Sequence, residues 1–207
     1  MRPTLLPEPE RRLVTGLVLS GGLGRRMSDD GRGVDKGLLP LRGQPMIRHA
    51  ISRLAPQVGA LLVNANGRLA DYARFGYPVV QDDPAGFVGP LAGLHAAMAT
   101  AATPWIVTVP CDSPFLPDDL VARLWQALDP ASSGGTRPAI ACTADGRRHP
   151  VFALVPRGLR AQLAAYLADG QRRVDDWYRQ QQAVAVRFDN GAAFDNLNTP
   201  EAMRARQ

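Results

Sequence analysis

The stretch LVLSGGLGRRM, residues Leu17–Met27, is the part of this 207-residue chain that decides its fold. It begins inside a compact apolar run, Val14–Leu19, which is typical of a buried strand. Three glycines, Gly21, Gly22 and Gly24, and then two arginines follow the run. Glycine lets a ligand approach the backbone closely, and a strand that leads into such a loop presents N–H groups to an anion. The stretch therefore predicts a phosphate-binding loop after the first strand.

Two well-known phosphate motifs do not fit this loop. A P-loop requires a lysine directly after its last glycine, but Met27 stands at that glycine position and Lys36 precedes Gly37. A dinucleotide-binding loop requires a third glycine where Met27 stands. A plain turn explains the glycines but neither the two arginines nor the lysine. The connection Ser20–Lys36 is also long, which is typical of a functional loop.

Elsewhere the hydrophobic period alternates between that of a strand and that of a helix. Apolar runs predict further strands at Ala60–Val63, Pro78–Val80, Trp105–Val109, Ala139–Cys142, Val151–Val155 and Ala183–Phe188. Helical spacing predicts helices at Pro45–Leu54, Leu69–Phe75, Pro90–Ala101, Pro117–Leu128, Leu159–Ala168 and Arg173–Gln180, and one that begins at Thr199-Pro200-Glu201. The alternation predicts an α/β fold, a mostly parallel sheet with helices on both faces. Ligands of such sheets bind outside the carboxyl ends of the strands.

Composition narrows the class of protein. The net charge is +5, but the basic residues are scattered and only 6% of residues are aromatic, so a nucleic-acid platform is not expected. No apolar run approaches the ~20 residues of a membrane span. Cys111 and Cys142 form no disulfide framework, which favours a cytoplasmic location. We expect residues 1–12 to be a flexible tail and residues 13–207 to form one domain, whose halves, 13–128 and 138–207, are separated by a Gly/Ser/Pro-rich break.

The run LSGGLGRRM…VDKGLLPLRGQPMIRH resembles the signature of nucleotidyltransferases with a Rossmann-like, GT-A-like fold. It is most similar to the molybdenum cofactor guanylyltransferase family. Further matches are LLVNAN, QDDPAGFVGPLAGL, VPCDSPFLP, RHPVFAL and NLNTPEA, so the resemblance extends from Thr15 to about Ala202. It implies that the first half binds the nucleotide and the second half binds the pterin cofactor.

The resemblance implies a reaction and a set of site residues. The reaction transfers GMP from GTP to the terminal phosphate of molybdopterin, with pyrophosphate as the other product. The residues implied to bind GTP are Leu19, Ser20, Gly21, Gly22, Gly24, Arg25, Lys36, Asn64, Asp82, Gly89, Pro90 and Asp112. Those implied to bind the pterin are Arg26, Asn196 and Asn198. Lys36, Asp112 and Arg26 are the implied catalytic residues, and Asp112 the implied ligand of Mg²⁺.

The residue types suit this chemistry. Both reactants are anions, so the site needs cations and N–H donors that hold them in line. One carboxylate is enough for Mg²⁺, because substrate phosphates and water complete its shell. Structural roles compete: Asp112 and Asp82 are also turn formers, Asn64 can cap a helix, and Asn196 and Asn198 can stabilise the turn before the last helix. His149 has no Cys or His partners at zinc spacing, so we interpret it as structural or substrate-lining.

Three other functions compete. A cytidylyltransferase acting on the same pterin is disfavoured by the double glycine Gly21-Gly22 and by the ending NLNTPEA. A sugar-1-phosphate nucleotidyltransferase is disfavoured by the short chain. A non-catalytic module that delivers the cofactor is disfavoured by the presence of Lys36 and Asp112. The resemblance also implies transient contacts with proteins of cofactor biosynthesis and with apo-molybdoenzymes.

Overall fold

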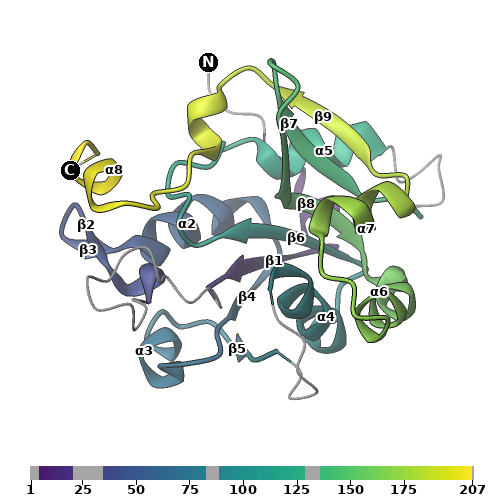
Figure 1. Cartoon of the computed structure of the whole chain (residues 1–207), viewed down its shortest axis with the longest axis horizontal. Helices are drawn as coiled ribbons and strands as arrows, with labels where there is room; N and C mark the ends of the chain where they lie inside the picture. Colours follow the sequence, from purple (N-terminus) through teal and green to yellow (C-terminus); the bar gives the residue numbers. More distant parts are fainter. Residues whose placement is uncertain (1–4, 21–34, 83–88, 129–135, 207) are drawn as a thin grey trace.

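A computed structural model of the chain describes residues 5–20, 35–82, 89–128 and 136–206 (Figure 1). The predictions made for Gly21, Gly22, Gly24, Arg25 and Arg26 lie outside these ranges. None of the helices in the described ranges is long and apolar enough to cross a bilayer.

A single large sheet forms the centre of the molecule, and its seven strands run in the order β5-β4-β1-β6-β8-β7-β9. β4 and β6 pair parallel with β1, β5 pairs parallel with β4, and β9 pairs parallel with β7. β8 is antiparallel to both of its neighbours. The prediction of a mostly parallel sheet is therefore confirmed. The strands are β1 Val14–Leu19, β4 Ala60–Asn64, β5 Val79–Val80, β6 Trp105–Pro110, β7 Ala139–Thr143, β8 Arg148–Pro156 and β9 Val184–Phe188.

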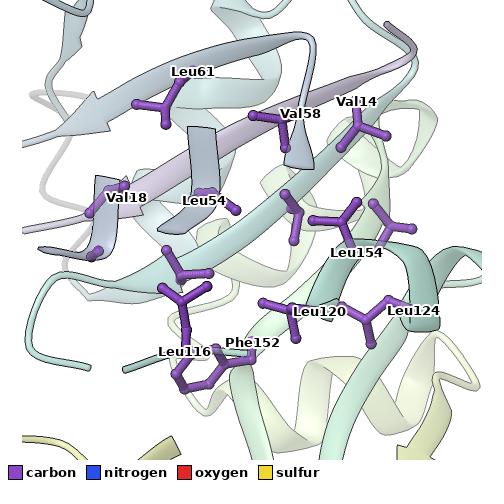
Figure 2. Close-up of a cluster of buried hydrophobic side chains, with 14 of the residues drawn as sticks. Val14, Val18, Leu54, Val58, Leu61, Leu116, Leu120, Leu124, Phe152 and Leu154 are labelled. Carbon is purple, nitrogen blue, oxygen red and sulfur yellow. The ribbon is translucent and has the colours of Figure 1, made fainter. Parts of the chain in front are cut away.

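Helices cover both faces of this sheet, as the sequence predicts (Figure 1). The helices are α1 Glu8–Arg11, α2 Met46–Leu54, α3 Leu69–Ala73, α4 Pro90–Thr100, α5 Leu120–Leu128, α6 Arg160–Ala168, α7 Val174–Gln180 and α8 Pro200–Arg204. The apolar residues of α5 and all those of α2 except Met46 join one core cluster, part of which is drawn in Figure 2. Met46 packs in a smaller cluster with Leu41, Leu197 and Met203. The apolar residues of α4, α6 and α7 join a second cluster.

Strand β1 contributes to both clusters because successive side chains point to opposite faces of a sheet. Val14 and Val18 lie in the cluster of α2 and α5, whereas Leu17 and Leu19 lie in the other. All six residues of β1 are buried. This burial on both faces explains why its sequence is a continuous apolar run and not an alternating one.

Three expectations about the elements need correction. Residues 5–12 are not a flexible tail, because Leu6 is buried in the core and residues 8–11 form α1. Helix α5 begins at Leu120 and not at Pro117, so no acidic residue stands in its first turn. The short hairpin of β2 (Pro40–Leu41) and β3 (Gln44–Pro45), which lies between Lys36 and α2, was not expected.

The parallel strands bring distant parts of the sequence to one edge of the sheet. At their carboxyl ends Leu19 lies opposite both Asn64 and Pro110, and Asn64 lies opposite Val80. The residues that follow these strands therefore meet at the same edge. This is the edge at which the sequence predicts ligand binding.

Candidate active site

A polar cluster of Lys36, Asp112 and Asn198 lies at this edge. Lys36 begins the 3₁₀ helix η2 (Lys36–Leu38), Asp112 follows β6, and Asn198 precedes α8. The Lys36 ammonium nitrogen lies 3.4 Å from Asp112 Oδ2 and donates a hydrogen bond to Asn198 Oδ1. The Lys36 and Asp112 side chains are only 19% and 12% exposed. The structure thus brings Asn198, which the resemblance grouped with the pterin, together with Lys36 and Asp112, which it grouped with GTP and catalysis.

Lys36 has a further distinction in the sequence, because it is the sole lysine of the chain. An ammonium group is a compact point charge with three donors, which suits contact with phosphate oxygens. Its burial beside a carboxylate keeps it from rotating freely into solvent. The structure thus holds the Lys36 ammonium in a defined position between Asp112 and Asn198.

Burial governs the ionisation of the neighbouring acids. It raises the pKa of the Asp112 carboxyl, and the charge and hydrogen bond of Lys36 oppose this rise. Burial also raises the pKa of the Cys111 thiol to about 12, so Cys111 is neutral at physiological pH. A neutral thiol in the core is a poor ligand for Mg²⁺, which prefers oxygen. Cys111 therefore acts as core packing beside the site.

The C-terminal segment is fastened to the loop after β6. The Leu197 N–H donates to the Asp112 carbonyl at 2.8 Å, and Ser113 Oγ donates to Asn196 Oδ1 at 2.9 Å. Asn196 thus holds the segment in place, while Asn198 reaches Lys36. The two asparagines that the sequence grouped together have different partners.

A second polar cluster lies at the ends of β4 and β5. Asn64 Nδ2 donates to Asp82 Oδ1 at 2.8 Å, and Asn66 Nδ2 donates to Asp82 Oδ2 at 2.7 Å. In return the Asp82 N–H donates to Asn66 Oδ1 at 2.9 Å. Sequence reasoning found Asn64 and Asp82 but missed Asn66. The spacing in the sequence could have indicated Asn66, because side chains two residues apart at a strand end can point to the same face.

Helix α4 packs closely against this second cluster. Gly89, with φ of +97°, stands at the N-cap of α4, and Pro90 is its first residue. A Cβ atom at Gly93 would lie 2.4 Å from Asn64 Oδ1 and 2.6 Å from Leu19 Cδ2. Gly89 and Pro90 thus set where α4 begins, and Gly93 lets the helix approach Asn64.

A cavity of about 570 Å³ adjoins the Lys36 cluster on the side of β8. It shares Asn196 and Asn198 with the site, and its lining includes Arg147, Arg148 and Arg206. His149 also lines the cavity, and its ring stacks on Phe194 with the ring centroids 4.8 Å apart. Burial and the charge of Arg147 lower the pKa of His149. Arg206 pairs with Asp195 of the same lining at 3.6 Å and Arg148 pairs with Asp175 at 2.9 Å, but the three arginines still outnumber the single lining carboxylate, so the cavity suits an anionic ligand. Sequence reasoning missed these arginines because they lie among many other arginines.

The oxygen atoms present are of the kind that Mg²⁺ prefers. In the described ranges no three His, Cys, Asp or Glu residues are grouped as a metal site would require. A single carboxylate, Asp112, with the amide oxygen of Asn198 nearby, fits an ion that takes the rest of its ligands from substrate phosphates and water. The donor set does not fit a structural zinc site.

Comparisons with known proteins identify the family of the chain. The family model of the MobA-like NTP transferase domain matches residues 16–184. The molybdenum cofactor guanylyltransferase of Cupriavidus taiwanensis is 50% identical over 198 residues, which cover 94% of this chain and 96% of that protein. A protein of the same name from Yersinia pseudotuberculosis is 45% identical over 190 residues, with coverage of 90% and 91%.

A solved structure shows the same fold. The molybdopterin-guanine dinucleotide biosynthesis protein A of Archaeoglobus fulgidus superimposes with a TM-score of 0.72 at 21% identity, covering 93% of this chain and 96% of that one. The likeness of fold and the much higher identity to the curated relatives lead to one conclusion. The chain belongs to the molybdenum cofactor guanylyltransferase family, among the MobA-like nucleotidyltransferases.

Proposed function

We propose that this protein transfers GMP from GTP to the terminal phosphate of molybdopterin, forming molybdopterin guanine dinucleotide and pyrophosphate. The observation that carries the proposal is the order of the groups along one edge of the sheet. Asn64 and Asp82 lie at β4 and β5, Lys36 and Asp112 lie beside β1 and β6, and the arginine-lined cavity lies beside β8. This order suits a nucleotide base, a reacting phosphate and an anionic acceptor in sequence.

The proposed step is an in-line displacement. An oxygen of the acceptor phosphate forms a bond to the α-phosphorus of GTP, and the bond between that phosphorus and the bridging oxygen to the β-phosphorus breaks. Pyrophosphate leaves with the electron pair. The acceptor phosphate is already ionised, so no general base is needed. Catalysis then depends on positioning and on neutralising charge.

The residues of the chain supply these functions. In the proposal the Lys36 ammonium turns from Asp112 toward the phosphates and neutralises charge as it develops. The Asp82 carboxylate, held by Asn64 and Asn66, accepts hydrogen bonds from the N–H groups of guanine. Arg147 and Arg206 attract the anionic acceptor into the cavity. Asn198 keeps Lys36 between the two substrates.

Mg²⁺ is part of the proposal, with Asp112 as its protein ligand. When bound, the ion would offset the negative charge of the GTP phosphates. A cytoplasmic location is also proposed, with support from the free thiols of Cys111 and Cys142. Transient contacts with other proteins of cofactor biosynthesis and with apo-molybdoenzymes complete the proposal.

Calorimetry with GTP, CTP and ATP in the presence of Mg²⁺ tests nucleotide choice. We expect selective binding of GTP that weakens by at least about tenfold in both Lys36→Ala and Asp112→Ala, as loss of a charged contact predicts. Asp189→Ala is the matched control, because its carboxylate is 84% exposed on the surface. Equal binding of all three nucleotides contradicts the assignment of guanine, and preference for CTP supports the cytidylyltransferase instead.

Turnover distinguishes an enzyme from a delivery module. The expected result is pyrophosphate release that requires both GTP and anaerobically prepared molybdopterin. Binding of GTP without any turnover would support the non-catalytic module.

A further inference from the structure

We infer that Tyr72 is a positioning residue for this reaction, which holds Lys36 in place relative to the end of β1. The inference rests on the proposed function for its effect on kcat/KM, whereas its effect on the position of Lys36 can be measured without any reaction. Tyr72 lies on α3, outside every motif that the sequence analysis singled out, and its side chain is fully buried.

The Tyr72 hydroxyl connects two segments of the site. It donates a hydrogen bond to Asp35 Oδ1 and is hydrogen-bonded to Ser20 Oγ, which leaves Ser20 as the donor in that pair. Ser20 directly follows β1, and Asp35 directly precedes Lys36. These two residues also stand on either side of residues 21–34, the stretch for which the sequence predicts the phosphate-binding loop. One hydroxyl group thus fixes both neighbours of that stretch.

The backbone around Lys36 lies directly against this hydroxyl. A Cβ atom at Gly37 would be 2.4 Å from Ser20 Oγ and 2.7 Å from the Tyr72 hydroxyl oxygen, so only glycine fits there. The Gly37 N–H also donates to the Asp35 carboxylate. Asp35 therefore has two donors, one from α3 and one from the turn that carries Lys36. A change in the position of Tyr72 is transmitted through Asp35 to Lys36.

The charges around Asp35 explain why a hydroxyl is needed. Burial raises the pKa of the Asp35 carboxyl, and hydrogen bonds from Tyr72 and Gly37 and the charge of Arg68 oppose the rise. Asp71 is a like charge that adds to the rise. Burial also raises the pKa of Tyr72 itself, so its hydroxyl remains protonated and able to donate. Phenylalanine would fill the same space and leave Asp35 with one donor fewer.

The test compares Tyr72→Phe with Tyr178→Phe. Tyr178 is the matched control, because it is also buried and its hydroxyl is bonded to Thr108, in the other core cluster. We expect kcat/KM for GTP to fall roughly tenfold in Tyr72→Phe, as loss of a hydrogen bond to a charged group predicts. We expect Tyr178→Phe to change the melting temperature alone.

A spectroscopic measurement separates positioning from general loss of stability. The chain has one lysine, so protein labelled with ¹³C at lysine Cε gives a single Lys36 signal. This signal should move in Tyr72→Phe without any nucleotide present and stay in place in Tyr178→Phe. Asp35→Asn should move it as well, and the double variant should lose little more activity than either single variant, because both act through one connection.

The outcomes distinguish this inference from the proposed function. If the wild type transfers no GMP, the proposed function fails, while the Lys36 signal still tests the position of the lysine. If Tyr72→Phe matches Tyr178→Phe in both kinetics and signal, the inference is overturned. If Tyr72→Phe does not fold, Ser20→Ala removes the same connection from its other end, and an unchanged Lys36 signal there overturns the inference.

Discussion

At the scale of single residues, the candidate site contains two charged side chains that are largely buried. Asp112 and Lys36 face each other at 3.4 Å with little exposure of either side chain. Their attraction does not fully offset the loss of hydration, because the pKa of Asp112 is still raised. The ionised carboxylate therefore lowers stability at neutral pH. This cost in stability fits the role with a bound ligand that we propose for Asp112.

Asp112→Asn is predicted to abolish GMP transfer and to raise the melting temperature at pH 7.5. A carboxyl with a raised folded-state pKa contributes full stability below its ordinary value of 3.8 and loses it as pH rises through the raised value. Asparagine resembles the protonated form at every pH. A gain of about 2–4 °C corresponds to about 1 kcal/mol in a domain of this size. Thermal unfolding of both proteins in metal-free buffer between pH 4 and 8 measures this difference in melting temperature.

The gain should shrink as pH falls toward the ordinary value of 3.8, because the wild-type carboxyl becomes protonated as pH falls through its raised pKa. A variant that is less stable than the wild type at pH 7.5 would contradict this view of Asp112. Asp189→Asn is a suitable control, since its carboxylate is exposed.

Part of the candidate site was predicted from the family resemblance, and the topology explains why its residues meet. Asn64, Asp82 and Asp112 each follow a recognisable strand, so a parallel sheet brings them to one edge. Tyr72 was not predictable, because its ring gives the same apolar signal as any core aromatic and only the folded structure shows where its hydroxyl points. Asn66 was missed because the resemblance implied no role for it, and only the folded structure shows its two hydrogen bonds with Asp82.

At the scale of elements, the contact of α4 with the strand ends controls the polar cluster that we propose binds the nucleotide. Gly93 allows this contact, because any Cβ atom there would collide with Asn64 Oδ1 and Leu19 Cδ2. Asn64 in turn orients the Asp82 carboxylate. A helix residue with no polar group thus determines the position of a polar cluster.

Gly93→Ala is therefore predicted to weaken GTP binding by roughly tenfold or more, because α4 or Asn64 must move. Alanine has a higher helix propensity than glycine by about 1 kcal/mol. The loss of GTP affinity would therefore occur even though the substitution favours the helix itself. Gly158→Ala is the matched control, since a Cβ atom there meets nothing within 4 Å. Calorimetric titration with GTP measures both variants, and equal affinities would refute the role of Gly93.

The elements with strong periodicity were predicted within a few residues. Helix α2 is an example, because Met46, Ile47, Ala50, Ile51 and Leu54 are all buried as their spacing requires. The weak elements were not predicted. Helix α1 and the β2–β3 hairpin are too short to show a hydrophobic periodicity in the sequence. Elements this short depend on tertiary contacts for their stability. The start of α5 was placed three residues early because a proline suited to a first helical turn precedes it.

At the scale of the whole molecule, one reversed strand completes the site. β8 is antiparallel to β6, so its first residues lie near the edge where the parallel strands end. Its last residue, Pro156, pairs with Trp105 at the start of β6, at the opposite edge. The sequence predicted a mostly parallel sheet but not which strand is reversed. It therefore could not bring Arg147 and Arg148 to the cavity.

This arrangement predicts that a substitution can change KM for one substrate without changing KM for the other. In the double variant Arg147→Gln/Arg206→Gln we expect KM for molybdopterin to rise roughly tenfold at low ionic strength, because two cations that attract the acceptor are lost. KM for GTP should stay close to that of the wild type, since Asn64 and Asp82 lie several strands away. The difference between variant and wild type should narrow as salt screens the attraction.

The control for this prediction removes two arginines from the opposite edge of the sheet. Arg160 begins α6 just after β8 ends, so Arg160→Gln and Arg157→Gln together remove the same charge at the far edge of the sheet. We expect this second double variant to leave KM for both substrates unchanged in anaerobic steady-state assays. Equal effects of the two double variants would mean that net charge, and not the cavity beside β8, attracts the acceptor. A rise in KM for GTP in the first variant alone would place the nucleotide in that cavity and reverse the order of the substrates along the sheet.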